Sequence, residues 1–462
     1  MNVVVLMLDS LRADFVGCGG HPQVRTPHMD RVAAEGVFLQ RAYAEYPITI
    51  PARTALLTGC YTWTNRPWQA LLPTDMHLAE VLREQGYATG GFSDGPFNAT
   101  AAIDRGFDEF WWTDTGKCFG HEGVEVDASD AWFPPDYEGR ERQYYTYTLQ
   151  GREVAMRRYG KQCPELLFER ALEWLEGVAG RPFFLWIDSF QPHEPWAPAS
   201  PYREMYDPGD HHRYIPMPMG PDITWAEEGD LEHIRRLYMG EATHTDDMVG
   251  LVVNRLEELG LSEDTLLVVM SDHGEPLGEH GAMRKFYVPL YDELARMLWI
   301  MRKPGLIPAG MRTDALVQNT DFAPTVLDWL GIKAPPRQAE RGFQGISGNE
   351  YMDGTSLAGL LAGETRTVHE YLYNGAFGLR ASILTDRHKL IDHQGEKPDE
   401  LFDMKADPGE QVNIIADEPE LARELHLRLW QFRMKWGSSL RWRDRPVRHK
   451  SGAVVQRGEP EH

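Results

Sequence analysis

Val3-Val4-Val5-Leu6-Met7-Leu8-Asp9 is the stretch that decides the fold, because an unbroken apolar run ends abruptly in a carboxylate. A strand that is apolar at every position is typical of a parallel sheet covered by helices on both faces. We therefore predict that residues 3–8 form a central strand. Since ligands of such sheets gather at the carboxyl ends of the strands, Asp9 is a candidate site residue.

Two further apolar runs, at residues 183–187 and 265–270, have the same character. Segments with helical spacing alternate with these runs: the clearest lies at residues 165–177, and another is predicted at residues 246–259, before Gly260. This alternation predicts an α/β fold with a large, mainly parallel sheet flanked by helices. Short mixed segments after residue 366, followed by a helix at 421–434, predict a small C-terminal α+β domain with an antiparallel sheet. We place the domains at 1–365 and 366–440, with a basic, polar tail at 441–462.

Composition narrows the class of partner. The 462 residues carry a formal net charge of −23, whereas general nucleic-acid binding needs a basic face. The four cysteines form no C-x-x-C pair, which favours free thiols in a reducing compartment. No apolar run approaches the roughly 18 residues that a membrane span needs. We predict a cytoplasmic protein with a small-molecule partner, no nucleic acid and no membrane, and leave open a homo-oligomer.

Asp272-His273 follows the third apolar run as Asp9 follows the first. Carboxylate oxygens and an imidazole suit a divalent cation such as Mn²⁺, Zn²⁺, Ca²⁺ or Mg²⁺. An Asp-His dipeptide alone is more often structural, so the interpretation requires that the strands meet in space. We predict one divalent metal ion bound by Asp9, Asp272 and His273, with a second ion left open.

Thr49-Ile50-Pro51-Ala52-Arg53 places a hydroxyl near the start of a predicted helix and a guanidinium one turn further on. A metal bound to the Thr49 oxygen would lower its pKa and make it a nucleophile, so Thr49 is predicted as both metal ligand and nucleophile. Arg53 could donate to a phosphoryl oxygen. The alternative is that Thr49 only caps the helix.

Two more residues complete the predicted catalytic set. His193, on a loop after the second apolar run, could protonate a leaving group, and Lys285 could neutralise developing charge. The alternatives are a solvated loop histidine and an ordinary surface lysine. Residues 110–160, rich in Trp and Tyr, and 201–228, rich in Pro, His and Met, look like insertions. Either they wall a pocket or they pack as surface loops.

Several ordered segments resemble the sulfatase family of the alkaline phosphatase superfamily. They are LDSLRAD and TIPARTALLTG near the N-terminus, DSFQPHEPW in the middle, and LVVMSDHGEPLGEHG with the lysine that follows it. The resemblance covers nearly the whole chain. It implies an alkaline phosphatase-like fold and the same roles for the same residues: metal ligands Asp9, Asp272 and His273, nucleophile Thr49 with Arg53 beside it, and substrate contacts from His193 and Lys285.

Departures from that family weaken a sulfatase assignment. Thr49 stands where sulfatases have a Cys or Ser that is oxidised to formylglycine, and threonine cannot give that aldehyde. Ala52 replaces the serine of the modification motif, and Ser10 replaces the second Asp of an Asp-Asp pair. Ser93-Asp94-Gly95-Pro96 lies where sulfatases carry a Lys and a His. With a threonine at the nucleophile position, the chain resembles those superfamily members that act on phosphorus.

The sequence therefore predicts a metal-dependent hydrolase of phosphate diesters or phosphonate monoesters that forms a covalent phospho-threonine intermediate. The alternative is a sulfuric-ester hydrolase (sulfatase) that works without formylglycine. A third hypothesis is a non-catalytic binding protein that keeps the fold, and the retained site residues argue against it.

Overall fold

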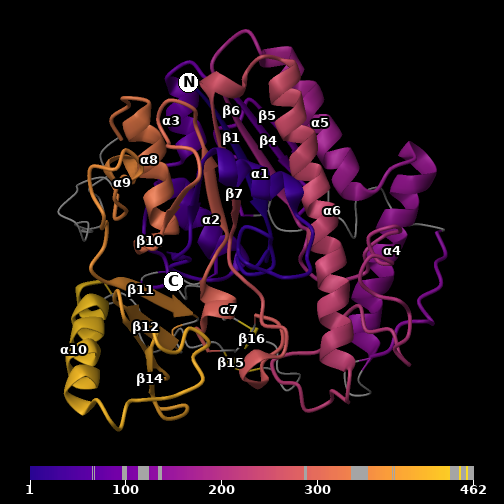
Figure 1. Ribbon diagram of the computed structural model, residues 1–462. Helices are drawn as coiled ribbons and strands as arrows, with labels where there is room; N and C mark the ends of the chain where they lie inside the picture. The colour runs from indigo at the N-terminus through magenta and orange to yellow at the C-terminus, as the bar shows by residue number, and fades with distance from the viewer. Residues whose placement is uncertain are drawn as a thin grey trace, which may run out of the picture.

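An eight-stranded sheet forms the centre of the larger domain (Figure 1), in the order β5-β4-β6-β1-β7-β8-β2-β9. The computed structural model describes residues 1–64, 66, 68–95, 101–112, 124–133, 138–285, 289–334, 352–376, 378, 380–436, 447–448 and 454–455. Only β8 runs antiparallel to its neighbours, so the predicted mainly parallel sheet is confirmed. The strands are β1 (Asn2–Leu8), β2 (Val37–Leu39), β4 (Ala88–Ser93), β5 (Glu109–Trp112), β6 (Phe183–Ser189), β7 (Thr265–Ser271), β8 (Trp299–Arg302) and β9 (Met311–Thr313).

β1 is buried on both faces, as its composition predicts. Its even-numbered side chains from residue 4 to 8 join a core with α1 (Pro27–Glu35), α5 (Cys163–Val178) and α6 (Asp230–Glu258). Its odd-numbered side chains from residue 3 to 7 join a second core with α2 (Thr49–Thr58), α3 (Leu78–Glu84) and α8 (Phe322–Trp329). The twofold repeat of a strand thus serves both helical layers.

The predicted C-terminal α+β domain is also confirmed. Its antiparallel sheet has the order β11-β12-β13-β14, and one face packs on α10 (Pro419–Trp436). The strands are β11 (Leu372–Ala376), β12 (Arg380–Leu384), β13 (His388–Asp392) and β14 (Glu400–Asp403). In Figure 1 this domain lies at the lower left, beside the end of the large sheet where α2 and α7 (Asp292–Ala295) are found. The predicted boundary at 365 falls between α9 (Ala358–Leu361) and β11.

A buried ion network joins the two domains. The Nζ atom of Lys389 on β13 lies 2.9 Å from Asp292 Oδ1 and 2.8 Å from Glu410 Oε1. The backbone N–H of Asp292 also donates to Glu410 Oε2 at 2.6 Å. Asp292 and Lys285 both lie in the part of the chain that follows β7. The network therefore connects the small domain to the segment that carries Lys285.

The remaining elements include two that the sequence interpretation placed differently. α6 begins at Asp230, well before the predicted start at 246, and α4 (Glu138–Tyr159) is a long helix within the presumed loop insertion. Short elements complete the described chain: β3 (Ala42–Tyr43), β10 (Val317–Gln318), β15 (Val447–Arg448), β16 (Val454–Val455), η1 (Ser262–Asp264), η2 (Glu279–Gly281) and η3 (Asn319–Asp321). β15 and β16 pair with each other, and the rest of the tail at 441–462 lies outside the described residues.

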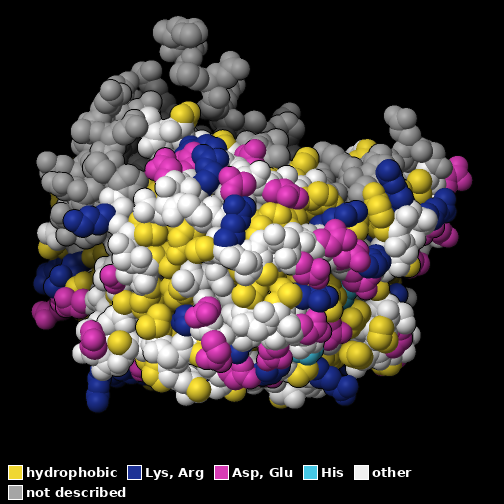
Figure 2. Space-filling model, turned by 90° about the horizontal axis from the view of Figure 1, so that it is seen from above, with side chains coloured by type: hydrophobic (Ala, Val, Ile, Leu, Met, Phe, Trp, Pro, Cys, Tyr) yellow, Lys and Arg dark blue, Asp and Glu magenta, His cyan; other side chains and the backbone are white. Residues whose placement is uncertain are grey.

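The surface mixes charges of both signs. On the face seen in Figure 2, lysine and arginine side chains are interspersed with acidic and apolar ones. Among the described residues, no helix combines the length and apolar character needed to cross a bilayer.

Candidate active site

The carboxyl ends of three neighbouring strands bring the predicted site segments together. Leu8 at the end of β1 pairs with Ser189 of β6 on one side and with Ser271 of β7 on the other. Asp9 and Asp272 therefore leave the sheet at the same level, next to the segment that leads to His193. The condition that these segments meet in space is fulfilled.

Arg53 on α2 lies at the centre of the site and is 1% exposed. Its Nε atom donates to Asp188 Oδ2 at 2.8 Å, and Nη2 donates to Asp188 Oδ1 at 2.6 Å and to Asp9 Oδ2 at 3.1 Å. Its Nη1 atom donates to Asp272 Oδ2 at 2.6 Å and to the carbonyl of Thr49 at 3.1 Å. One guanidinium thus joins the ends of β1, β6 and β7 to the first turn of α2.

These five bonds use every N–H donor that a guanidinium has. A contact between Arg53 and a phosphoryl oxygen would require one bond to be exchanged, so that role stays a prediction. The observed bonds make Arg53 a residue that positions its neighbours. Asp188, its main partner, has no role in the sequence interpretation, although its place at the end of an apolar run resembles that of Asp9.

Asp9, Asp272 and His273 form a buried group whose ligand atoms lie within 4.8 Å of one another. His273 Nδ1 is 2.7 Å from the carbonyl of Gly274, so it carries the hydrogen and Nε2 keeps a lone pair. That Nε2 atom is buried, has no hydrogen-bond partner among the residues that the structure describes, and lies 3.4 Å from Asp272 Oδ2. An orphaned imidazole nitrogen beside two carboxylates fits a divalent cation.

Two other groups of described residues bring His and Asp ligand atoms equally close, but neither is fully buried and neither contains a buried histidine nitrogen without a partner. Asp230, near His211 and His212, accepts two bonds from Arg213. Asp246, near His28, accepts the backbone N–H groups at the start of α1 at 3.0 and 2.7 Å. Within the described residues, the predicted group is therefore the best candidate metal site.

The protonation states of two of these side chains suit metal binding. Burial raises the pKa of Asp9, but the charges of Arg53 and Lys285 outweigh it and hold that pKa well below its ordinary value. Burial lowers the pKa of His273, and the negative charge of Asp272 opposes this shift only in part. Asp9 is thus an ionised carboxylate and His273 a neutral imidazole, the forms in which these side chains bind a metal ion.

Thr49 is the first residue of α2, and Ile48 occupies the N-cap position. No side chain caps this helix end, so the alternative that Thr49 serves as an N-cap is wrong. Thr49 is 5% exposed, and its carbonyl bond to Arg53 places it beside the carboxylates. The hydroxyl of Thr49 is therefore not used to cap α2, and its role as nucleophile stays a prediction.

Ser10 and Lys285 form the next layer. The backbone N–H of Ser10 donates to Asp272 Oδ1 at 2.9 Å, and its hydroxyl donates to Asp9 Oδ1 at 2.8 Å. Lys285 Nζ donates to Ser10 Oγ at 3.1 Å and lies 3.9 Å from Asp9 Oδ1. Since Lys285 is 3% exposed, the surface-lysine alternative is wrong. Ser10 thus links Lys285 to Asp9.

His193 is held by its own neighbours. Its Nδ1 atom lies 2.7 Å from the carbonyl and 3.1 Å from the carboxylate Oε2 of Glu194, and its ring stacks on Phe190 at 4.1 Å. The side chain is 10% exposed, which excludes the solvated-loop alternative. Burial lowers the pKa of His193 to about 4, although Glu194 opposes this shift.

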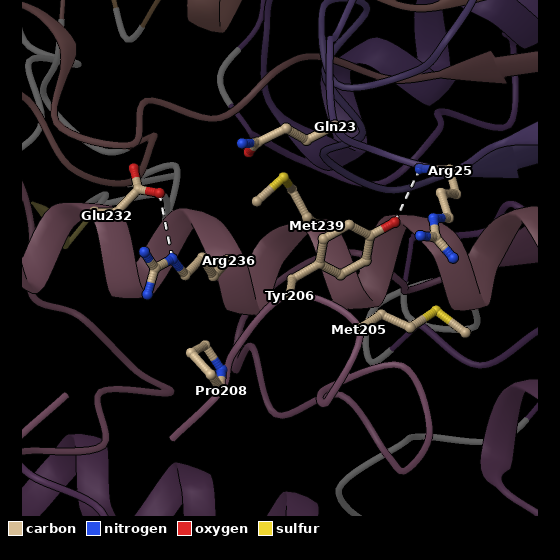
Figure 3. A pocket seen from close by; sticks show the side chains of 8 residues that line it. All are labelled: Gln23, Arg25, Met205, Tyr206, Pro208, Glu232, Arg236 and Met239. Carbon is tan, nitrogen blue, oxygen red and sulfur yellow. Dashed lines mark hydrogen bonds and ion pairs between the residues drawn. The ribbon is translucent and has the colours of Figure 1, made fainter. Parts of the chain in front are cut away.

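The two presumed insertions differ in what they do. Met205, Tyr206 and Pro208 line a pocket of about 420 Å³ against α6 (Figure 3), which contains none of the predicted site residues. Thus residues 201–228 do wall a pocket, but one separate from the site. In the other insertion Phe133 and Tyr145 pack together in a small core of their own.

An alkaline phosphatase-like sheet with Asp9, Asp272 and His273 at the ends of its strands is typical of a class of metal-dependent hydrolases. The chain belongs to the sulfatase family, whose sequence model matches residues 1–332. A second model, described as N-sulphoglucosamine sulphohydrolase, C-terminal, matches residues 278–435.

Known relatives span both sulfur and phosphorus chemistry by name. The multifunctional alkaline phosphatase superfamily protein PehA of Trinickia caryophylli is 26% identical over 505 aligned positions, covering 90% of this chain and 91% of the relative. The ulvan-active sulfatase of Formosa agariphila is 26% identical and covers 96% and 83%. Among solved structures, the phosphonate monoester hydrolase SpPMH from Silicibacter pomeroyi superposes with a TM-score of 0.73 at 23% identity, covering 99% and 100%.

Proposed function

We propose that this protein hydrolyses phosphate diesters or phosphonate monoesters with Thr49 as the nucleophile. The observation that carries the proposal is the supply of positive charge. Arg53 donates all its N–H groups to the protein. Within the described residues Lys285 donates one hydrogen bond, to Ser10, and its Nζ atom lies 3.6 Å from Glu275 and 3.9 Å from Asp9, so it keeps donors for a substrate oxygen. A diester or a phosphonate monoester carries one negative charge, whereas a phosphate monoester carries about 1.5 to 2 near neutral pH. One lysine and a divalent cation suit the single charge.

In the first half of the reaction, the Thr49 oxygen forms a bond to phosphorus as the bond to the leaving oxygen breaks. A bound divalent cation, held by Asp9, Thr49, Asp272 and His273, would lower the pKa of the hydroxyl and neutralise the nonbridging oxygens. Lys285 donates to a nonbridging oxygen. The product of this half is phospho-threonine at position 49 and the free alcohol.

In the second half, water attacks phosphorus from the side that the leaving group has vacated. The bond between phosphorus and the Thr49 oxygen breaks, and the phosphorus acid leaves. His193 as imidazolium gives its proton to the leaving oxygen in the first half and takes one from the attacking water in the second. Thr49 would enter the first half as the alkoxide, its proton released to solvent, and would leave phosphorus again as the alkoxide in the second half, so the proton count is restored after each turnover.

The names of relatives support the phosphorus assignment without deciding it. PehA is described as multifunctional, and the phosphonate monoester hydrolase shares the fold over nearly the whole chain. The alternative, a sulfuric-ester hydrolase without formylglycine, is favoured by the sulfatase relatives. We rank it second because a sulfo-threonine would be a stable ester that is difficult to hydrolyse. Cytoplasmic location and the absence of nucleic-acid and membrane partners stay predictions from composition.

The test is an activity panel with Mn²⁺, and then other divalent ions, on four aryl substrates: a phosphodiester, a phosphonate monoester, a phosphate monoester and a sulfate ester. We expect turnover of the first two, lost in Thr49→Ala and partly kept in Thr49→Ser, which retains a hydroxyl. Dominant sulfate turnover would favour the alternative. Activity that survives Thr49→Ala would refute the nucleophile.

A further inference from the structure

A buried ion pair lies behind His193. Arg284 Nη2 is 2.6 Å from Glu194 Oε1, and Glu194 is 0% exposed. The same guanidinium reaches α4, where Nη1 donates to Glu141 Oε2 at 3.3 Å. Arg284 has a φ of 61°, a conformation that costs a non-glycine residue on the order of 1–3 kcal/mol. Its surroundings must therefore stabilise this placement, and the pair with Glu194 does so.

Glu194 presents two acceptors to one nitrogen of His193. The backbone carbonyl and the carboxylate both face Nδ1, at 2.7 and 3.1 Å. Neither can donate, so Nδ1 carries the hydrogen and Nε2 is the atom that exchanges a proton with a substrate. The stacked ring of Phe190, tilted by 22°, restricts rotation of the imidazole.

The leaving-group step explains why this nitrogen should face a charge. To protonate an alcohol oxygen, His193 must first become an imidazolium, and burial opposes that charge. A carboxylate beside Nδ1 stabilises the imidazolium without taking its proton, as the aspartate of a Ser-His-Asp triad does. Arg284 keeps this carboxylate ionised and fixed, since burial raises the Glu194 pKa but Arg284 and His193 lower it further.

We infer that Glu194 and Arg284 are positioning residues that hold His193 in its Nδ1–H tautomer and stabilise its imidazolium while the Nε2 proton passes to the leaving oxygen. The inference rests on the proposed function. In balanced form, the phosphorus–oxygen bond electrons go to the leaving oxygen, that oxygen takes the Nε2 proton, and neutral His193 later takes a proton from the attacking water.

The experiment measures kcat/KM of the wild type and of Glu194→Gln with two esters of the same phosphonic acid, one aryl and one alkyl. The 4-nitrophenyl ester needs no proton on its leaving group, whereas an alkyl ester does. We expect kcat/KM for the alkyl ester to fall about 10²-fold or more, the usual worth of acid–base catalysis, and that for the 4-nitrophenyl ester to fall less than about tenfold. A residue with only a structural role would lower both equally.

Glu141→Gln is the matched control, because it removes the other carboxylate of Arg284, while the carboxylate beside His193 is that of Glu194. It should change both esters to the same small extent. If Glu194→Gln does not fold, Glu194→Asp retracts the carboxylate but keeps its charge. In that variant kcat/KM should fall less than in Glu194→Gln, and the fall should again be larger for the alkyl ester than for the 4-nitrophenyl ester. Equal losses on both esters in the folded variant would overturn the inference.

A second readout separates this inference from the proposed function. The ¹⁵N spectrum of the histidine rings reports the tautomer directly, and His193→Gln identifies the signal by its disappearance. We expect an Nδ1–H tautomer in the wild type and a mixture of tautomers in Glu194→Gln. An Nε2–H tautomer in the wild type would overturn the inference even if esterase activity were found. Loss of ester activity in the panel, with the tautomer as expected, would reject only the proposed function.

Discussion

Asp188→Asn should disable the site through Arg53, its main partner; the indole of Trp186 also donates to Asp188, at 3.3 Å. The carboxylate of Asp188 accepts two of the five Arg53 bonds, at 2.8 and 2.6 Å. An asparagine can keep one of them, because its amide nitrogen is a donor that would face another donor. Losing one hydrogen bond to a charged group costs about 1.5–3 kcal/mol. The free energy of unfolding in urea should fall by that amount.

The effect on catalysis should be larger than the effect on stability suggests. Arg53 also holds Asp9, Asp272 and the Thr49 carbonyl, so a shift of its guanidinium displaces metal ligands and nucleophile together. Displacements of about 1 Å can reduce rates on the order of 10²-fold. We expect a loss of that size in kcat for the aryl phosphonate, with the fold intact.

Asp230→Asn is the matched control for this prediction. Asp230 is another fully buried aspartate that accepts two bonds from one arginine, Arg213, outside the site. It should lower the free energy of unfolding by a similar amount and leave kcat unchanged. If Asp188→Asn matched the wild-type kcat, or if both variants lost activity equally, the positioning role of Arg53 would be refuted.

Three further predictions concern metal, pH and the domain contact. Chelation should abolish turnover and Mn²⁺ should restore it, while His273→Ala should weaken Mn²⁺ binding in calorimetry by more than the roughly 10–100-fold typical of outer-shell losses; unchanged binding would place the metal elsewhere. Burial raises the pKa of Glu45 from 4.5 to about 8, so the folded state keeps a proton that the unfolded chain releases. The free energy of unfolding should therefore fall as the pH rises from about 4.5 to about 8. A series of Tm measurements over this pH range should show a smaller fall in Glu45→Gln than in the wild type. An equal fall in the variant would contradict the assignment. Lys389→Met leaves Asp292 and Glu410 unpaired and should cost about 3–5 kcal/mol in urea unfolding, whereas a cost below 1 kcal/mol would show that the contact is not buried in solution.

Sequence reasoning succeeds where a single local pattern decides the outcome. β1, β6 and β7 are apolar at nearly every position, and only a strand between two helical layers buries them all. The carboxyl-end rule then brings Asp9 and Asp272 together without any knowledge of distances. α6 was placed too late because its first half buries polar side chains such as His233, Glu241 and His244, which hide the apolar stripe.

Other features depend on contacts between distant segments, which no local pattern shows. α4 was missed because its apolar residues do not fall on one face, and its Glu141 is paired with an arginine far along the chain. The full occupancy of the Arg53 donors requires three strands and one helix to meet. The hydrogen on Nδ1 of His193 depends on how the Glu194 backbone turns.

The pairing of β1 has a consequence for synthesis on the ribosome. Val3 pairs with Phe184 on one side and with Leu266 on the other, so the innermost strand is made long before both of its partners. At about 5–20 residues per second, the second partner emerges roughly 10–50 s later. Until then an apolar strand with two open edges is exposed in the nascent chain, and such edges recruit other strands. Chaperone binding to the first residues of this chain should therefore outlast synthesis of the whole N-terminal half.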